Sequence, residues 1–194
     1  MVGAILTQNT AWTNVEKAIR NLKRRKLLNF SSLNRAADRA VADAIRPAGF
    51  FRVKTRYLKT LISHIQTRHR GQIARFLAQS GEHLRAELLS IKGIGPETAD
   101  SILLYAAHKP FFVVDAYTRR IFQRMGLLTG RESYEAVRRA FESAIPSGTR
   151  IYNEYHALIV RHAKETCRPR PLCGECALES GCLKVNAMIP DRKN

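Results

Sequence analysis

Two short segments carry the residue types that could do chemistry: a hairpin built on Gly93 and Gly95, and a later aspartate, Asp115. Both glycines lack a side chain, so the backbone between them can approach a partner closely. Pro96 then opens a helix, and the free amides at a helix start bind anions such as a DNA phosphate. Asp115 follows the apolar run 111–114, where poor solvation would raise the pKa of its carboxyl. The two segments predict a grip on a nucleic-acid backbone beside an acid.

Asp115 has a second interpretation, because an aspartate directly before a helix commonly caps it. A helix is predicted from residue 116, so the residue type alone favours the cap. The hairpin upstream favours a catalytic role instead, and the two roles are compatible.

All four cysteines lie close together near the C-terminus, which predicts one shared inorganic centre. They are Cys167, Cys173, Cys176 and Cys182. Structural zinc usually uses two close pairs of ligands, whereas this run has one pair with two intervening residues. A [4Fe–4S] cluster is therefore favoured, zinc is the alternative, and four free buried cysteines are disfavoured.

The overall charge indicates a polyanionic partner. Lys and Arg number 33 against 16 Asp and Glu, which gives a net charge of +17 and a pI near 10.4. The basic residues fall in clusters along the whole chain, and the acids are too few to neutralise them, so nucleic acid is the favoured partner. No apolar run approaches the ~20 residues of a membrane span, so a membrane partner is disfavoured.

The elements that must position these groups are helices. A capping box at Thr13 and Glu16 predicts a helix start. Only residues 111–114 look extended, and one such run cannot make a sheet, so the fold class is all-α. The other predicted helices are 36–45, one that follows Phe51, a short one at 73–77, 86–91, one from Pro96, 116–125, 133–144 and 151–164.

The N-terminus shows no secretory signal, because residues 1–6 are apolar but too short and lack a positive flank. We therefore expect an intracellular protein, cytoplasmic or associated with the nucleoid, in which cysteines are metal ligands rather than disulfides. The same residues look like the middle of an apolar helix, so we expect a truncated N-terminal helix.

Taken in order, the motifs resemble those of the endonuclease III family of helix-hairpin-helix DNA glycosylases. They are Gln8–Thr10, Gly49–Phe50, Lys92–Ala99, Val114–Asp115, His156–Ile159 and the four-cysteine loop. The resemblance implies an all-α, helix-hairpin-helix fold of two subdomains with a DNA-binding cleft between them. It also implies a monomer that acts on double-stranded DNA containing a damaged base.

The resemblance divides the chain into three segments. Residues 1–12 belong with the cluster subdomain, 13–125 form a helical subdomain with the helix-hairpin-helix at 86–107, and 126–194 form the C-terminal subdomain with the cluster loop at 167–182.

Three departures from the family pattern narrow the expected activity. Bifunctional members carry a lysine nucleophile where this chain has Glu97, and a Schiff base with the sugar needs an amine. The first cysteine gap is five residues where endonuclease III has six, a change that a loop can absorb. Tyr117 stands where some members have a histidine. Together these features resemble most the 3-methyladenine glycosylases of endonuclease III type, which excise the base and leave the strand intact.

The resemblance also implies a role for each site residue. Asp115 would stabilise a cationic sugar and direct a water to C1′. Trp12, Tyr117 and Glu97 would line the base pocket, although an aromatic residue is more often part of a core and Glu97 could simply favour a helix start. The residues expected to contact DNA are Gln8, Phe50, Lys92, Gly93, Ile94, Gly95 and Thr98.

Two further functions remain open from the sequence. The first is a bifunctional glycosylase and AP lyase for oxidised pyrimidines that uses another lysine. The second is a non-catalytic DNA-binding module that uses the hairpin and cluster for docking only.

Overall fold

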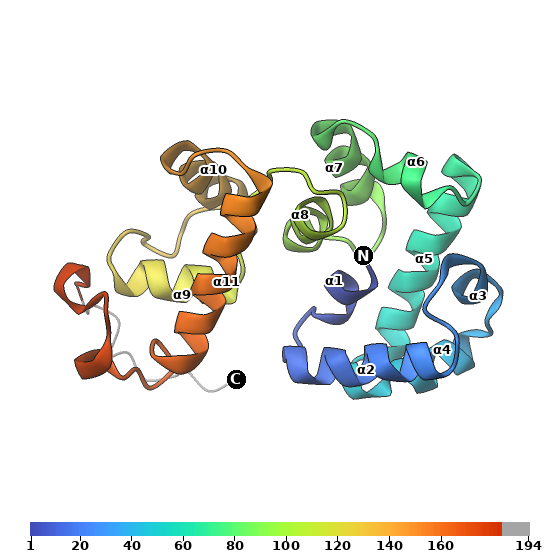
Figure 1. Ribbon diagram of the computed structural model, residues 1–194, viewed down its shortest axis with the longest axis horizontal. Helices are drawn as coiled ribbons and strands as arrows, with labels where there is room; N and C mark the ends of the chain where they lie inside the picture. The colour runs from blue at the N-terminus through green and yellow to red at the C-terminus, as the bar shows by residue number, and fades with distance from the viewer. Residues whose placement is uncertain (184–194) are drawn as a thin grey trace. The chain divides into compact units, whose positions relative to one another are not determined.

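The computed structural model of the protein describes residues 1–183, and the chain divides into two compact units, Met1–His108 and Lys109–Asn194. Every regular element of the described residues is a helix, which confirms the all-α prediction (Figure 1). None of these helices has the length and apolar content that crossing a membrane requires.

The first unit holds the N-terminal helices and both helices of the hairpin motif. Its elements are α1 Val2–Leu6, α2 Trp12–Arg24, α3 Phe30–Arg35, α4 Asp38–Ile45, η1 Arg46–Ala48, α5 Phe51–His69, α6 Ile73–Leu77, α7 Gly81–Ser90 and α8 Pro96–Tyr105. The long helix α5 is the spine of this unit, with α1, α3, α4 and α6 packed against it. Leu58, Leu61 and Ile65 form its apolar stripe, and each such buried side chain stabilises the fold by about 1.5–3 kcal/mol.

A buried ion pair joins the two helices that flank the hairpin. Arg85 of α7 donates from Nε and Nη2 to the two carboxylate oxygens of Asp100 of α8, at 2.7 and 3.2 Å. Asp100 is fully buried, so losing either partner would leave an uncompensated buried charge at a cost of about 3–5 kcal/mol. The pair therefore fixes the angle at which α7 and α8 present the hairpin.

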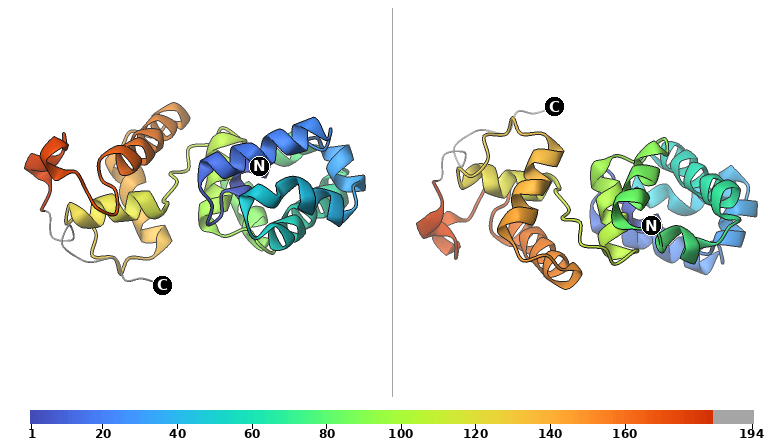
Figure 2. Two further views of the ribbon diagram at one scale, coloured as in Figure 1. Left: turned by 90° about the horizontal axis from the view of Figure 1, so that it is seen from below. Right: turned by 90° about the horizontal axis from the view of Figure 1, so that it is seen from above.

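The second unit holds α9, α10, α11 and the cysteine loop (Figure 2). Its elements are α9 Ala116–Arg124, α10 Tyr134–Ala144, α11 Thr149–Glu165, η2 Cys173–Glu175 and η3 Glu179–Gly181. An aromatic cluster forms its core: Phe112 stacks on Phe141 with ring centroids 4.3 Å apart, and Tyr152 meets Phe112 edge-on. The apolar run before Asp115 belongs to no helix or strand of residues 1–183, and its Phe112 is fully buried.

The units differ from the predicted segments at both boundaries. Helix α1 packs against α2, α5 and α8, so residues 1–12 lie with the hairpin unit rather than with the cysteine loop. The second boundary falls after His108 instead of after residue 125, because α9 packs against α11.

Several helix ends also differ from the sequence prediction. The capping box is absent: Ala11 is the N-cap of α2, and Glu16 accepts a hydrogen bond from the indole of Trp12 at 3.0 Å instead. Helix α3 was not predicted, although the Asn29 side chain caps it through the Ser32 amide. Helix α8 begins at the predicted Pro96, for which the sequence predicted no end. The helices α9 to α11 begin and end within two residues of their predicted bounds.

Candidate active site and cysteine pocket

The hairpin exposes backbone rather than side chains. Gly93 has φ +96°, and a Cβ there would lie 2.2 Å from the ring of Tyr57, so this position requires glycine on two counts. The side chain of Ile94 is buried, whereas Lys92 and Gly95 are exposed. No side chain caps α8, so its first amides are available to an anion.

Gln8 joins the loop after α1 to the hairpin. Its Nε2 donates to the carbonyl oxygen of Gly93 at 2.9 Å and lies 3.0 Å from the hydroxyl of Thr98. The Thr98 side chain is buried, so its hydroxyl would affect DNA binding through Gln8 rather than by direct contact. The structure thus brings together three of the residues that the sequence assigns to DNA contact.

Lys54 is a buried lysine that the sequence analysis missed. The side chain is 2 % exposed, and its Nζ donates to Leu6 O at 2.7 Å, Thr10 Oγ1 at 2.6 Å and Ala48 O at 2.8 Å. Burial lowers the pKa of Lys54 to about 8. The ammonium links the loop that carries Gln8 to the loop that carries Phe50. No local sequence pattern predicts this link.

Phe50 is the most exposed large apolar side chain of the described residues, at 69 %. It is also the N-cap of α5 with φ +43°, a left-handed conformation that is costly for a bulky residue. Trp12 is 46 % exposed at the start of α2, and Glu97 is exposed in the first turn of α8. Phe50, Trp12 and Glu97 are therefore solvent-exposed side chains of this unit.

Asp115 both caps α9 and pairs with a histidine. Its Oδ1 accepts from the amide of Thr118 at 2.7 Å and from the Thr118 hydroxyl at 2.9 Å. Its Oδ2 lies 3.5 Å from Nε2 of His156 on α11. The cap therefore uses one oxygen and leaves the other on the side of His156.

The pKa of Asp115 is lowered, which reverses the prediction from its apolar surroundings. Burial alone raises this pKa, but hydrogen bonding to His156, the attraction of His156 and the two bonds from Thr118 outweigh it. The carboxylate is therefore ionised at neutral pH, which favours a role through charge over a role as a strong base.

Tyr117 lies two positions after Asp115 and is half-buried. The guanidinium of Arg120 stacks over its ring at 5.2 Å from the centroid. This cation–π contact helps to orient the ring of Tyr117.

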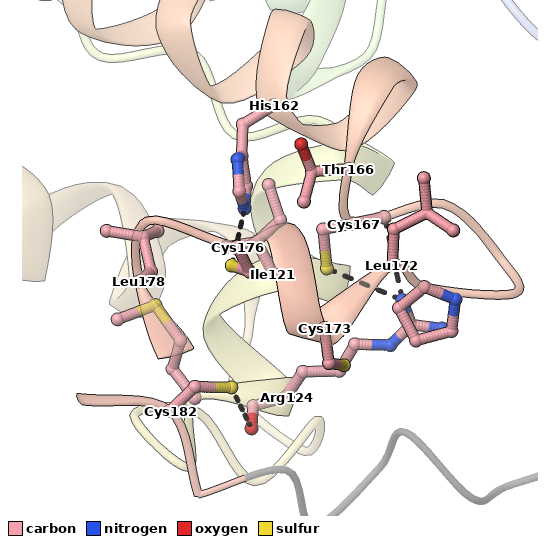
Figure 3. Close-up of a pocket in the computed structure, with 12 residues that line it drawn as sticks. Ile121, Arg124, His162, Thr166, Cys167, Leu172, Cys173, Cys176, Leu178 and Cys182 are labelled. Carbon is pink, nitrogen blue, oxygen red and sulfur yellow. Dashed lines mark hydrogen bonds between the residues drawn. The ribbon is translucent and has the colours of Figure 1, made fainter. Parts of the chain in front are cut away.

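The four cysteines line one pocket together with side chains from α9 and α11 (Figure 3). Arg124 Nη1 lies 3.4 Å from the sulfur of Cys167, and His162 Nε2 lies 3.6 Å from that of Cys176. The predicted gathering of the cysteines around one space is present. Polar groups at hydrogen-bond range of two sulfurs suit thiolate ligands of a metal centre.

Two arginines of α9 hold the start of the cysteine loop. Arg124 donates to the carbonyl oxygens of Arg168 and Pro169, the first at 2.5 Å and the second at 2.9 Å. Arg120 donates to Cys167 O at 3.1 Å and Ala163 O at 2.9 Å. From the sequence these arginines are predicted only to add positive charge, whereas in the structure they anchor the loop on α9, the helix that Asp115 caps.

Comparison with known proteins places these features in one family. The family model described as HhH-GPD superfamily base excision DNA repair protein matches residues 2–147. A provisionally named DNA repair glycosylase of Methanocaldococcus jannaschii is 45% identical over 185 residues, which cover 94% of this chain and 84% of that protein. Endonuclease III of Sulfolobus acidocaldarius is 30% identical over 143 residues, 73% of this chain and 61% of that one.

Solved structures share the fold. The Helicobacter pylori 3-methyladenine DNA glycosylase bound to 1,N6-ethenoadenine matches with a TM-score of 0.74 and 28% identity, over 84% of this chain and 83% of that one. A non-covalent endonuclease III–DNA complex matches with a TM-score of 0.80 over 94% and 81% of the two chains. At 21% identity, the second match speaks for the fold alone.

Proposed function

The chain belongs to the HhH-GPD superfamily of base excision DNA repair proteins and is a DNA glycosylase, and we propose that it releases alkylated purines by hydrolysis alone. The observation that carries the proposal is Glu97, exposed in the first turn of α8 at the position where the sequence resemblance expects a lyase lysine. A carboxylate cannot form the Schiff base through which such a lysine cuts the strand.

The chemistry of an N-alkylated purine suits this residue set. Such a base is cationic, so it leaves as a neutral molecule with the bonding electron pair and needs no proton from an acid. The remaining tasks are to hold the flipped base, to stabilise the cationic sugar and to admit a water to C1′. The water loses its proton as the new C–O bond forms, and the product is an abasic site.

Asp115 would stabilise the cationic sugar. Its lowered pKa keeps the carboxylate ionised, and its cap on α9 fixes the carboxylate in place. A preorganised charge in a poorly solvated site is worth more to a transition state than the same charge in water. A weak base can still orient the attacking water through Oδ2, on the side of His156.

The flipped base would be held by aromatic faces and by negative charge. Trp12 presents an exposed indole, and Tyr117 presents a ring that Arg120 helps to orient. A cationic base stacks on such faces more strongly than a neutral one. The carboxylate of Glu97 adds an attraction that an uncharged base would not gain, which is a basis for selecting alkylated purines.

The hairpin and its neighbours would grip the DNA without reading its sequence. The backbone amides at the start of α8 and the ammonium of Lys92 are the proposed phosphate contacts. Phe50 is the proposed wedge that fills the gap left by the flipped base, and its strained backbone supports such a role. For Gln8 to enter the gap as well, it would have to exchange its two hydrogen bonds to the hairpin for contacts with DNA.

The cysteine pocket fits a [4Fe–4S] cluster held by Cys167, Cys173, Cys176 and Cys182. Four ligands around one tetrahedral zinc bring their sulfurs to about 3.8 Å of each other. Among residues 1–183, the one group of three potential metal-ligand atoms within 4.8 Å of one another contains no cysteine. No three of these sulfurs therefore lie as close together as one zinc ion would hold them. When bound, the cluster would act as a rigid crosslink of the loop.

A relative supports the proposed substrate class, and another supports a rival. The H. pylori protein is named for 3-methyladenine and holds an ethenoadenine base. The S. acidocaldarius relative is an endonuclease III, which favours a second candidate: a bifunctional enzyme for oxidised pyrimidines that uses a different amine. Lys54 has a lowered pKa, but its amine is buried and bonded to three oxygens, so it is poorly placed to attack a sugar.

The test incubates the protein with duplexes carrying methylated purines, ethenoadenine or an oxidised pyrimidine, with and without borohydride. We expect free alkylated purine and no trapped covalent adduct. The Glu97→Lys variant serves as a positive control for trapping, because it restores an amine at this position. A trapped adduct with the unmodified protein, or release of oxidised pyrimidines alone, would overturn the proposal.

A further inference from the structure

Three potential metal ligands converge at the end of α5 that lies far from Phe50. His64 and His69 of α5 place their Nε2 atoms 2.6 and 2.7 Å from the same oxygen, Oε1 of Glu87 on α7. The three ligand atoms all lie within 4.8 Å of one another. His64 is fourteen positions from Phe50, which is about 20 Å along the helix, so this cluster is separate from the proposed DNA wedge.

The donor set is one that metal sites use. Two imidazole nitrogens and one carboxylate oxygen are the protein ligands of many zinc sites that keep a fourth position open, and of non-haem iron sites. Imidazole favours zinc and its transition-metal neighbours over magnesium or calcium, which prefer oxygen ligands. We propose that His64, His69 and Glu87 bind one divalent transition-metal ion, with zinc as the probe, and that the ion joins α5 to α7.

The surroundings hold these ligands in place. Gln79 donates from Nε2 to the other carboxylate oxygen of Glu87 at 2.6 Å, which orients the ligand oxygen. The buried ring of Phe76 meets both imidazoles edge-on, with centroids 6.5 Å from His64 and 5.1 Å from His69. A ligand that is already oriented loses less rotamer freedom when an ion binds.

The charge of the cluster also suits a cation. The carboxylate of Glu87 lies between the two imidazoles and supplies negative charge to a bound ion. Lys59 and Arg68 line the surface pocket beside His64 and oppose a cation, so the affinity rests on the three direct ligands.

Binding requires only small movements. Ligand atoms around a tetrahedral zinc lie about 3.3 Å apart, so the nitrogens and the oxygen would separate by about 0.6 Å from their present hydrogen bonds. Each Nε2 must give up the hydrogen it now donates, either by losing a proton from an imidazolium or by moving it to Nδ1. The side chains are 21 %, 12 % and 19 % exposed for His64, His69 and Glu87, so an ion can enter from solvent and keep a water as its fourth ligand.

The ion would brace the helix that leads into the hairpin. Glu87 lies on α7, whose other anchor is the buried pair between Arg85 and Asp100. A crosslink from α7 to the spine helix α5, added to the ion pair that joins α7 to α8, would therefore stiffen the hairpin without touching DNA.

The test is zinc protection of the intact protein, cluster included, from histidine modification by diethyl pyrocarbonate, read residue by residue by mass spectrometry. With zinc at ten times its dissociation constant, modification of His64 and His69 should fall about tenfold. His83 on α7 is exposed and lies outside the cluster, so it should be modified equally with and without zinc. Equal modification of all three histidines with and without zinc would overturn the proposal.

Metal counting supplies the matched variants. We expect the unmodified protein and His83→Ala to retain one more zinc per chain than His69→Ala or Glu87→Gln after equilibrium dialysis. Iron is measured in the same samples, because zinc captured by emptied cysteines would accompany a loss of iron. Equal zinc in all four proteins at equal iron, or no zinc in the unmodified protein, would contradict the site.

Discussion

The two units of the molecule divide the proposed work in different ways. In the first unit, the groups proposed to contact DNA are the backbone amides at the start of α8 and the side chains of Lys92 and Phe50. The buried Lys54 holds the loop before Phe50 in place. In the second unit, the proposed chemistry rests on one side chain, Asp115, whose two oxygens have separate neighbours. DNA binding is therefore shared by many groups of the first unit, whereas base release depends on the single carboxylate of Asp115 in the second.

Burial acts on the two units with opposite results. It lowers the pKa of Lys54 and so favours the neutral amine, which has only neutral oxygens as partners. Asp115 is also buried, but His156 and Thr118 reverse the effect and favour the charged form. Burial therefore sets the direction of the pKa shift at Lys54, whereas hydrogen-bonding and charged partners reverse it at Asp115.

The largest expected effect comes from Asp115 in the second unit. Asp115→Asn keeps the shape of the cap but removes the charge, so base release should fall by about 10²–10⁴-fold. DNA affinity should be unchanged, since the grip lies in the other unit. Single-turnover release and DNA-binding assays measure the two, with the exposed Asp38→Asn as control. An Asn variant that keeps the full rate would remove Asp115 from the mechanism.

In the first unit, the largest effect on stability and DNA binding should come from the hairpin turn at Gly93. Gly93→Ala forces a side chain into φ +96° and against Tyr57, which should cost at least about 1–3 kcal/mol of stability and weaken DNA binding. Gly95→Ala is the matched control, because a Cβ there meets nothing within 4 Å. Thermal unfolding and DNA titration distinguish the variants. Equal melting temperatures for both would show that the turn does not require Gly93.

Lys54→Met should cost about 1–3 kcal/mol, because it leaves buried carbonyl oxygens without their donor. Its pH signature is specific. The folded state has a pKa of about 8 against the ordinary 10.5, so the unfolded chain binds more protons between these values and stability from this group rises with pH across that window. Denaturant titrations at several pH values should show the rise in the unmodified protein and lose it in the variant. An identical pH dependence in both would refute the assignment.

The smallest expected effect is the change in the rate of base release at acid pH. Because the pKa of Asp115 lies below its ordinary value of 3.8, base release should not decline through this group as the pH falls from neutral toward that value. Its contribution to stability is likewise present above 3.8 and is lost as the pH falls through the lower folded-state pKa. Rates at a fixed saturating DNA concentration test this. A decline centred near about pH 5 that Asp115→Asn lacks would indicate a raised pKa.

Local patterns predicted much of the fold. The helix opened by Pro96, those from α9 to α11 and the gathering of the cysteines all follow from spacing over a few turns. The cap of α2 was mispredicted because Glu16 has a competing partner, the indole of Trp12. The predicted segments and the compact units differ for residues 1–12, because the resemblance assigned those residues whereas α1 packs against α2, α5 and α8.

The groups that the sequence missed all depend on contacts between distant positions. Lys54 meets Leu6 and Thr10 from more than forty residues away, and Arg124 reaches the cysteine loop across a similar separation. Nothing in the sequence near Glu87 announces its two histidines. The sign of the pKa shift at Asp115 was missed for the same reason, since His156 lies two helices further on.

The most direct test of the central claim is the fate of one duplex that carries a single N-methylated, cationic purine, treated with excess protein and borohydride. The account predicts that the free base is released, the strand stays intact until alkali is added, and no protein is covalently bound. A borohydride-trapped adduct, or strand cleavage without alkali, would contradict the claim that Glu97 marks a glycosylase that removes the base alone.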